Sequence, residues 1–87
     1  MANSYTLDLL TQSADAMQME VPQNKNLLAR ALKCSIRLEI SAANMQRCAP
    51  EFSWDKASAN RRKKELRASG YRVALMEITE AGGLRAV

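Results

Sequence analysis

Residues 53–73 read SWDKASANRRKKELRASGYRV, and this stretch decides the fold that we expect. Ser53 is a favourable N-cap, and Gly70 stands where a helix often ends in a left-handed residue. Neither proline nor glycine interrupts the residues between them. Ala59 and Leu66 fall on one side of a helix that turns by about 100° per residue. The stretch therefore predicts a helix that begins after Ser53, buries a narrow stripe and exposes a broad face.

The exposed face of this predicted helix is basic. Residues 56–72 hold seven Lys or Arg and one acidic residue, Glu65. A single carboxylate is too few to pair all of these cations along the helix. Small Ala side chains allow close approach to the major groove of DNA, where Arg and Asn can bond a base edge bidentately. We expect Lys56, Asn60, Arg61 and Lys64 in the groove, and Arg62, Arg67 and Arg72 on phosphates.

The preceding residues predict two helices, a strand and a short third helix. Apolar residues at three- and four-residue spacing predict a helix over 4–19, and Asn24 is an N-cap for a second helix. Residues 36–40 alternate between apolar and polar side chains, which predicts a half-buried strand. Ser41 can cap a short helix over 42–48, with Ala42 and Met45 directed inward and Pro50 after its end.

The residues after Gly70 predict a hairpin. Residues 71–79 are rich in apolar and β-branched side chains, residues 81–83 can form a tight turn, and residues 84–87 would return as a strand. From residue 24 the order is helix, strand, helix, helix, strand, turn, strand. We therefore expect an α+β winged helix-turn-helix domain over 24–87, a three-helix cluster beside a small antiparallel sheet, plus an extra N-terminal helix over 1–23. The expected wing contains Gly82, Gly83 and Arg85.

Charge is distributed unevenly along the chain. The formal net charge is +4, yet residues 1–24 contain three acidic residues and no Lys or Arg. Positive charge gathered in one short segment attracts polyanions. The acidic N-terminal helix permits two interpretations, and both stay open. It packs onto the domain, or it contacts a second copy or another protein through Leu7, Leu10 and Met17.

Composition argues against catalysis. The chain has 87 residues, no His and two Cys without metal-ligand spacing, and we find no acid–base pair and no glycine-rich phosphate loop. We therefore expect no enzymatic activity, cofactor, metal or small-molecule substrate. Cys34 and Cys48 are expected to be buried. Apolar stretches are too short to span a membrane and no signal peptide is visible, so we expect a cytoplasmic protein without a membrane contact.

Residues 59–73, ANRRKKELRASGYRV, followed by a predicted hairpin, resemble the recognition helix and wing entry of small winged helix-turn-helix proteins. Such proteins are common in bacteriophages and prophages as regulators of gene expression. The resemblance covers residues 24–87 and implies a transcriptional regulator that binds double-stranded DNA, with a possible homodimer through the N-terminal helix. Two alternatives stay open: a scaffold that docks on a host protein and modulates it, or an excisionase-like protein that bends DNA.

Overall fold

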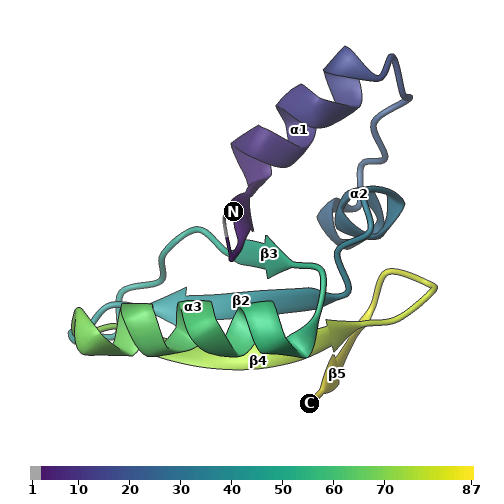
Figure 1. Cartoon of the computed structure of the whole chain (residues 1–87). Helices are drawn as coiled ribbons and strands as arrows, with labels where there is room; N and C mark the ends of the chain where they lie inside the picture. Colours follow the sequence, from purple (N-terminus) through teal and green to yellow (C-terminus); the bar gives the residue numbers. More distant parts are fainter. Residues whose placement is uncertain (1–2) are drawn as a thin grey trace.

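Three helices and a five-stranded antiparallel sheet form the part of the chain that the structure, a computed structural model, describes, residues 3–87 (Figure 1). The strands lie in the order β1-β3-β2-β4-β5, and every neighbouring pair is antiparallel. The fold is therefore α+β, as expected. The elements along the chain are β1 (Tyr5–Thr6), α1 (Leu7–Ala16), α2 (Lys25–Ala31), β2 (Ile36–Ser41), β3 (Glu51–Ser53), α3 (Lys56–Ala68), β4 (Arg72–Ile78) and β5 (Leu84–Ala86).

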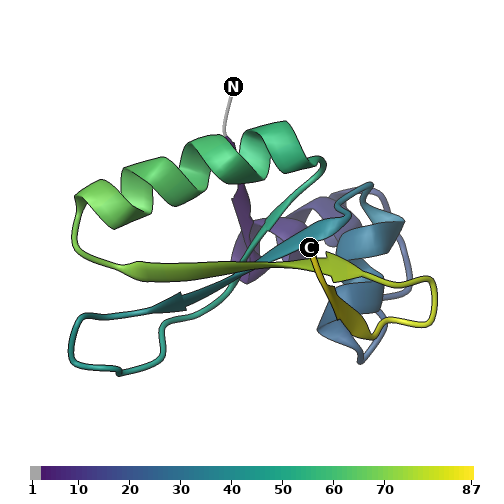
Figure 2. The ribbon, with the colours of Figure 1, turned by 90° about the horizontal axis from the view of Figure 1, so that it is seen from below.

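The predicted alternation of β2 is confirmed, and it separates the two faces of the sheet. Ile36, Leu38 and Ile40 are buried, while the residues between them are half-buried. These three side chains form one core with Ala59 and Leu66, the residues predicted to face inward from the basic helix. Helix α3 therefore covers this face of the sheet (Figure 2).

Helices α1 and α2 belong to a second core on the other face. Phe52 of β3 and Ile78 of β4 are fully buried there, together with Leu10 and Ala14 of α1 and Leu28 of α2. Leu10 and Ala14 of α1 therefore pack onto the domain, which is one of the two interpretations of the N-terminal helix. Of the three residues predicted to contact a partner from α1, Leu10 is buried, Leu7 is partly buried and Met17 is exposed.

The predicted ends of the helices are partly confirmed. Asn24 caps α2, where its side chain accepts hydrogen bonds from the amides of Asn26 at 2.8 Å and Leu27 at 3.2 Å. Gly70 follows α3 with φ of +93°. The predicted cap of α3 is wrong, because Asp55 accepts from the amide of Ser58 whereas Ser53 lies in β3.

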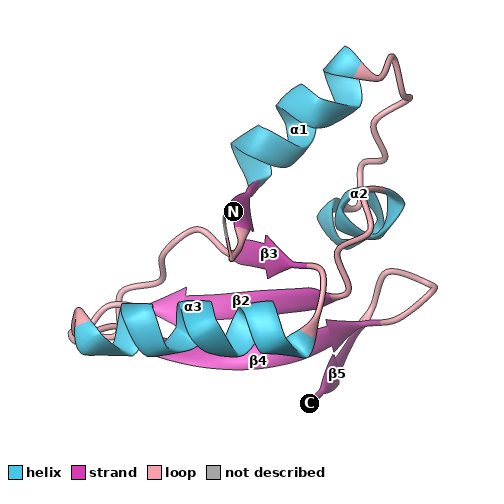
Figure 3. Ribbon diagram, viewed as in Figure 1, coloured by secondary structure: helices cyan, strands magenta, loops and turns pink. Residues whose placement is uncertain are grey.

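The helix predicted over 42–48 is wrong. This segment is a loop that joins β2 to β3 (Figure 3). The amide of Ala42 donates to the carbonyl of Gln46 at 2.8 Å, and Met45 adopts φ of +70° at the turn. A short helix here would bury only two small or flexible side chains. The loop instead lets Phe52 return beside β2 and bury its ring, which is the larger hydrophobic gain.

This correction changes the expected helix arrangement. A helix-turn-helix motif needs a second helix joined to the recognition helix by a short turn. Within residues 3–87, β3 rather than a helix comes directly before α3. The expected three-helix cluster is also wrong, because α3 and the α1–α2 pair lie on opposite faces of the sheet. What remains of the expectation is a basic helix followed by a β-hairpin.

The turn of this hairpin packs against α2, not beside α3. Gly82 has φ of +85°, and its carbonyl accepts from the Asn26 side-chain amide at 2.9 Å. Arg85 pairs with Glu77 on β4. The expected wing residues therefore lie apart from the outward face of α3.

Gly82→Ala is expected to lower the free energy of unfolding by about 2–5 kcal/mol. A positive φ costs an L-residue about 1–2 kcal/mol, and overpacking typically costs about 1–3 kcal/mol. A Cβ at Gly82 would stand 2.8 Å from Cγ of Leu27 and 2.9 Å from Nδ2 of Asn24. Gly70→Ala is the matched control, since its φ is also positive but nothing lies within 4 Å of the added carbon. Urea denaturation compares them, and equal losses would contradict the packing of the turn on α2.

Candidate nucleic-acid interface

Helix α3 carries a straight row of polar side chains along its length. Lys56, Asn60, Lys63 and Arg67 follow one another at spacings of four, three and four residues, which places them on one line of a helix. Lys63 is half-buried and the other three are exposed. The row is roughly 16 Å long at a rise of about 1.5 Å per residue. We call these four residues the α3 row.

The middle of the outward face lies beside this row. Lys64 is exposed there between the small residues Ala57 and Ala68. Arg61 lies on the far flank, where Nε donates to Oδ1 of Asn3 and Nη2 donates to Oγ of Ser58, both at 3.2 Å. Both hydrogen-bond partners are neutral, and Arg61 makes no ion pair among the described residues. Its charge does act on the exposed N-cap Asp55, whose pKa is lowered by the hydrogen bonds from Ser58 and by Arg61.

The one carboxylate within α3 is held away from the α3 row. Glu65 accepts from Asn3 Nδ2 at 2.9 Å and from Arg62 Nη1 at 3.0 Å. These contacts lie toward β3, on the flank opposite to the row. The α3 row and Lys64 therefore present cations with no acidic side chain directed among them, while Arg61 shares the partner Asn3 with Glu65.

Arg62 has a partner within the protein. Its Nε donates to Oε1 of Glu51 at 2.8 Å and its Nη2 donates to Oε2 at 3.1 Å, a bidentate pair between α3 and β3. The Ser4 hydroxyl also bonds this carboxylate. Donating these hydrogen bonds to Glu51 raises the pKa of Arg62. Arg62 was expected to contact a phosphate. Its guanidinium instead links α3 to β3 of the sheet.

Glu51→Gln is expected to lower stability at pH 7 by about 2 kcal/mol, the usual loss for hydrogen bonds to a charged group. Burial alone would raise the pKa of Glu51, but the hydrogen bonds from Arg62 and Ser4 outweigh it and hold the pKa below the ordinary 4.5. A lowered pKa stabilises the fold above the unfolded value, and the stabilisation is lost as pH falls through the folded value.

The difference between the wild type and Glu51→Gln should therefore be constant above about pH 5 and should shrink as the pH falls through the acid range, where Glu51 becomes protonated. Denaturation at a series of pH values measures it. Glu65→Gln is the matched control, because Glu65 bonds the same Arg62 but its side chain is 53% exposed against 14% for Glu51. A larger loss for the control than for Glu51→Gln would contradict this role.

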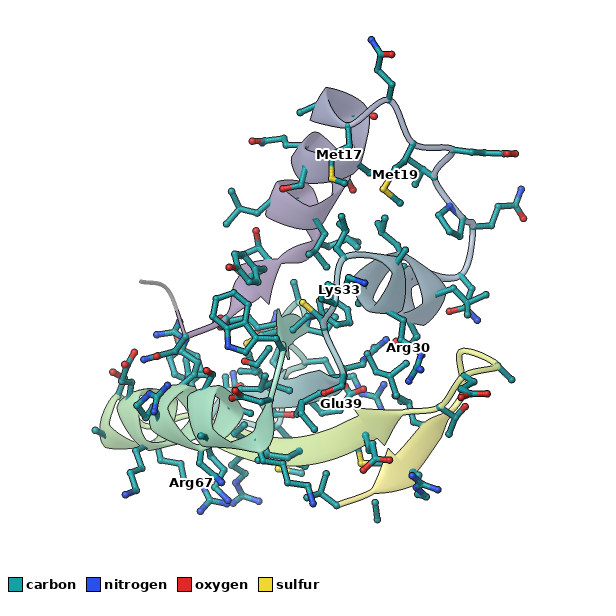
Figure 4. All side chains as sticks on the ribbon, turned by 45° about the vertical axis from the view of Figure 1, so that its right-hand side comes forward. Met17, Met19, Arg30, Lys33, Glu39 and Arg67 are labelled. Carbon is teal, nitrogen blue, oxygen red and sulfur yellow. The ribbon has the colours of Figure 1, made fainter. Side chains whose placement is uncertain are left out.

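Arg67 lies at the C-terminal end of the α3 row. Its Nη2 donates to the carbonyl of Val73 on β4 at 3.3 Å. Figure 4 shows Arg67 on the side of the molecule away from α1. This single bond to a carbonyl positions the guanidinium and leaves its charge uncompensated.

Of the residues predicted to contact DNA, the structure brings five together on α3: Lys56, Asn60, Arg61, Lys64 and Arg67. Arg72 lies elsewhere, since it pairs with Ser41 on the sheet face opposite to α3. The prediction missed Lys63, although its position seven residues after Lys56 places it in the same row. It also missed Arg47, which it placed in the helix that is not formed.

Among residues 3–87, no cluster of His, Cys, Asp or Glu could hold a metal ion. Burial raises the pKa of the Cys34 thiol to about 11, which disfavours the reactive thiolate. Cys48 is exposed, so its predicted burial is wrong. Across the same described residues, no helix has the length and apolar character needed to cross a bilayer.

The chain was compared with known proteins in three ways. No protein-family model matches it, and no match is found among curated proteins or among solved structures.

Proposed function

We propose that the protein binds double-stranded DNA by laying the outward face of α3 in the major groove. One observation carries the proposal: α3 exposes cations along its outer side while its only carboxylate is turned away. Duplex DNA carries one negative charge per about 1.7 Å of axis, so such a surface gains affinity by releasing counterions. The cations are Lys56, Arg61, Lys63, Lys64 and Arg67.

The position of α3 in the fold suits this mode of binding. The helix is an outer layer, and a major groove about 12 Å wide accepts an α-helix. The exposed Ala57 and Ala68 allow close approach. Asn60 is placed to meet a base edge. The five cations of α3 are placed to meet phosphates.

A regulatory role is part of the proposal. Helix α3 followed by the β4–β5 hairpin has the helix-then-hairpin order of a winged-helix domain, and α3 takes the role of the recognition helix. Because the hairpin turn packs on α2, recognition in this proposal depends on α3 without a contribution from Gly82 or Gly83. The proposed role is regulation of gene expression, of the kind that small phage and prophage proteins perform.

Selection of bound sequences from random duplexes, followed by titration of a labelled duplex at several salt concentrations, tests the function. Five phosphate contacts predict a slope of roughly −4 to −5 in log affinity against log salt. Asn60→Ala should reduce the preference for the selected site over random duplex by about tenfold, because bidentate base contacts give about 1–3 kcal/mol of discrimination. Gln12→Ala is the matched control, because it truncates an exposed amide on α1 and should leave the preference unchanged.

Two results would contradict the proposal. Absence of duplex binding at low salt would contradict DNA binding. Equal affinity for selected and random duplexes would contradict recognition of base edges by Asn60.

A second candidate function is docking on a partner protein or on a second copy through α1. It is favoured by an open groove of about 250 Å³, lined by Tyr5, Leu10, Ser13, Met17, Leu32 and Trp54. Met17 is 63% exposed and the nearby Leu9 is 46% exposed. Deleting residues 1–23 is not a clean test, because it removes Leu10 and Ala14 from the core. Leu9→Gln with Met17→Gln is cleaner, and loss of cellular activity with unchanged DNA affinity would support this candidate.

A further inference from the structure

Arg47, Ser41 and Arg72 form a row across the sheet face opposite to α3. Ser41 at the end of β2 is opposite Arg72 of β4, and its other side is bridged to Arg47 of the β2–β3 loop. Residues directly opposite one another in antiparallel strands project to the same face. Two strand spacings separate the outer Cα atoms by roughly 10 Å. We call this the cross-strand row.

The row carries two positive charges that the protein itself does not balance. Both arginines are exposed, and among the described residues neither makes an ion pair or a side-chain hydrogen bond. The nearest acidic residue on this face is Glu39, two residues before Ser41. Glu39 forms an ion pair with Arg37, whose Nε lies 2.7 Å from Oε1 of Glu39. An anion that lies between the two guanidiniums would neutralise both charges.

Hydrogen bonds within the β2–β3 loop hold the backbone at Arg47 beside β2. The amide of Cys48 donates to the carbonyl of Ile40 at 3.0 Å, and the amide of Met45 donates to the carbonyl of Ala42 at 2.9 Å. The side chain of Asn44 accepts from the amide of Gln46 at 3.1 Å. These bonds make an ordered hairpin on the far side of the sheet from α3 (Figure 2). A preformed site loses less entropy on binding than a mobile one.

The structure assigns to this row a second binding site for the phosphate backbone of duplex DNA, which would let one protein molecule hold two duplex segments. Two guanidiniums with a hydroxyl between them match a phosphate group, whose several oxygens can accept from both sides. The surface beside the row is open, with Ala74 exposed, and so suits a polymer better than an enclosed small molecule.

The outward face of α3 and the cross-strand row lie on opposite faces of the sheet. A duplex that lies on α3 has the whole sheet between itself and the cross-strand row, so the row must contact a different segment. The inference therefore rests on the proposed function of α3. The cross-strand row adds a second contact, so that one protein molecule holds two duplex segments together.

A bridging assay with the full chain tests this. Beads carry one short duplex, and capture of a fluorescent second duplex is measured at 0.1 M salt. The wild type should capture it. The double variant Arg47→Gln/Arg72→Gln should weaken second-duplex binding roughly fiftyfold, because each phosphate contact contributes about 0.9 log unit at this salt. Its affinity for a single dilute duplex should change much less.

Lys25→Gln/Lys33→Gln is the matched control, since it removes the same charge from the start of α2 and from the residue after its C-cap, and it should bridge like the wild type. Inorganic phosphate gives a readout without DNA: it should shift the amide resonances of Ser41, Arg47 and Arg72 in the wild type and not in the double variant. This measurement also verifies that the variant is folded.

The outcomes separate the two proposals. Equal bridging by the double variant and the wild type, or no bridging by a wild type that binds single duplexes, would overturn the cross-strand row as a DNA site. If the wild type binds no duplex, the proposed function of α3 has failed and with it the bridging role. In that case, a phosphate-induced shift confined to the amides of the cross-strand row would still support a phosphate site there. If phosphate caused no shift, that site would be overturned too.

Discussion

Replacing Lys63, Lys64 and Arg67 together by Gln lowers the affinity for duplex DNA by two to three orders of magnitude at 0.1 M salt. This is the expected result if all three meet phosphates, because each contact contributes roughly 0.9 log unit at that salt concentration. The slope of log affinity against log salt should become shallower by roughly 2.7. Fluorescence anisotropy with a labelled duplex at four or more salt concentrations measures both quantities.

The matched control removes three positive charges from other surfaces: Lys25→Gln, Lys33→Gln and Arg85→Gln. Net charge then falls equally in both variants, so any difference between them reports the position of the charge. The control includes Arg85, the expected wing contact, which pairs with Glu77 in the structure. If the control loses as much affinity as the α3 variant, binding follows net charge and α3 is not the interface.

Phe52→Ala is expected to cost about 3–5 kcal/mol of unfolding free energy, the usual loss for a buried aromatic ring. The ring is 0% exposed and joins β3 to α1 and α2, and the guanidinium of Arg37 lies 5.8 Å from its centroid. Small domains have unfolding free energies of about 5–15 kcal/mol, so this loss is a large fraction of the total. Thermal and urea denaturation followed by circular dichroism measure the loss.

Met45→Ala serves as the companion variant. A Met buried in a helix over 42–48 would cost about 2–5 kcal/mol when truncated. In the observed loop Met45 is 66% exposed, so the expected loss is below about 0.5 kcal/mol. A large loss for Met45→Ala with a small loss for Phe52→Ala would contradict the placement of β3.

Periodicity predicted the elements that carry one uninterrupted pattern. The structure confirms the alternation over 36–40 and the buried stripe of Ala59 and Leu66. In both cases the spacing of the apolar residues alone indicates which side of the element is buried. The segment 42–48 was misjudged because its spacing of small residues suits a helix, while the decisive residue, Phe52, lies outside it. A strand as short as β3 has no period of its own and is specified only by its neighbours in the sheet.

The candidate site was predictable in part for a similar reason. Helical geometry alone places Lys56, Asn60, Lys64 and Arg67 outward, since they lie away from the buried stripe. The partners of Arg62 depend on β3 and on the chain near Asn3, which are distant in sequence. The cross-strand row depends on two strand pairings at once, and no local pattern encodes those pairings.

Strand β2 is the central strand, paired with both β3 and β4. Its Ile36, Leu38 and Ile40 lie in the core beneath α3, and on its other face Arg37 lies against the ring of Phe52, which belongs to the core of α1 and α2. The two layers of helices therefore cannot melt independently, because loosening either one removes support from the same central strand. In a mutational scan that measures only DNA binding, substitutions in α1 and α2 will also lower the binding, although these helices lie on the sheet face opposite to α3. Such positions report the fraction of folded molecules, and hydrogen exchange along β2 is the measurement that distinguishes them from true contacts.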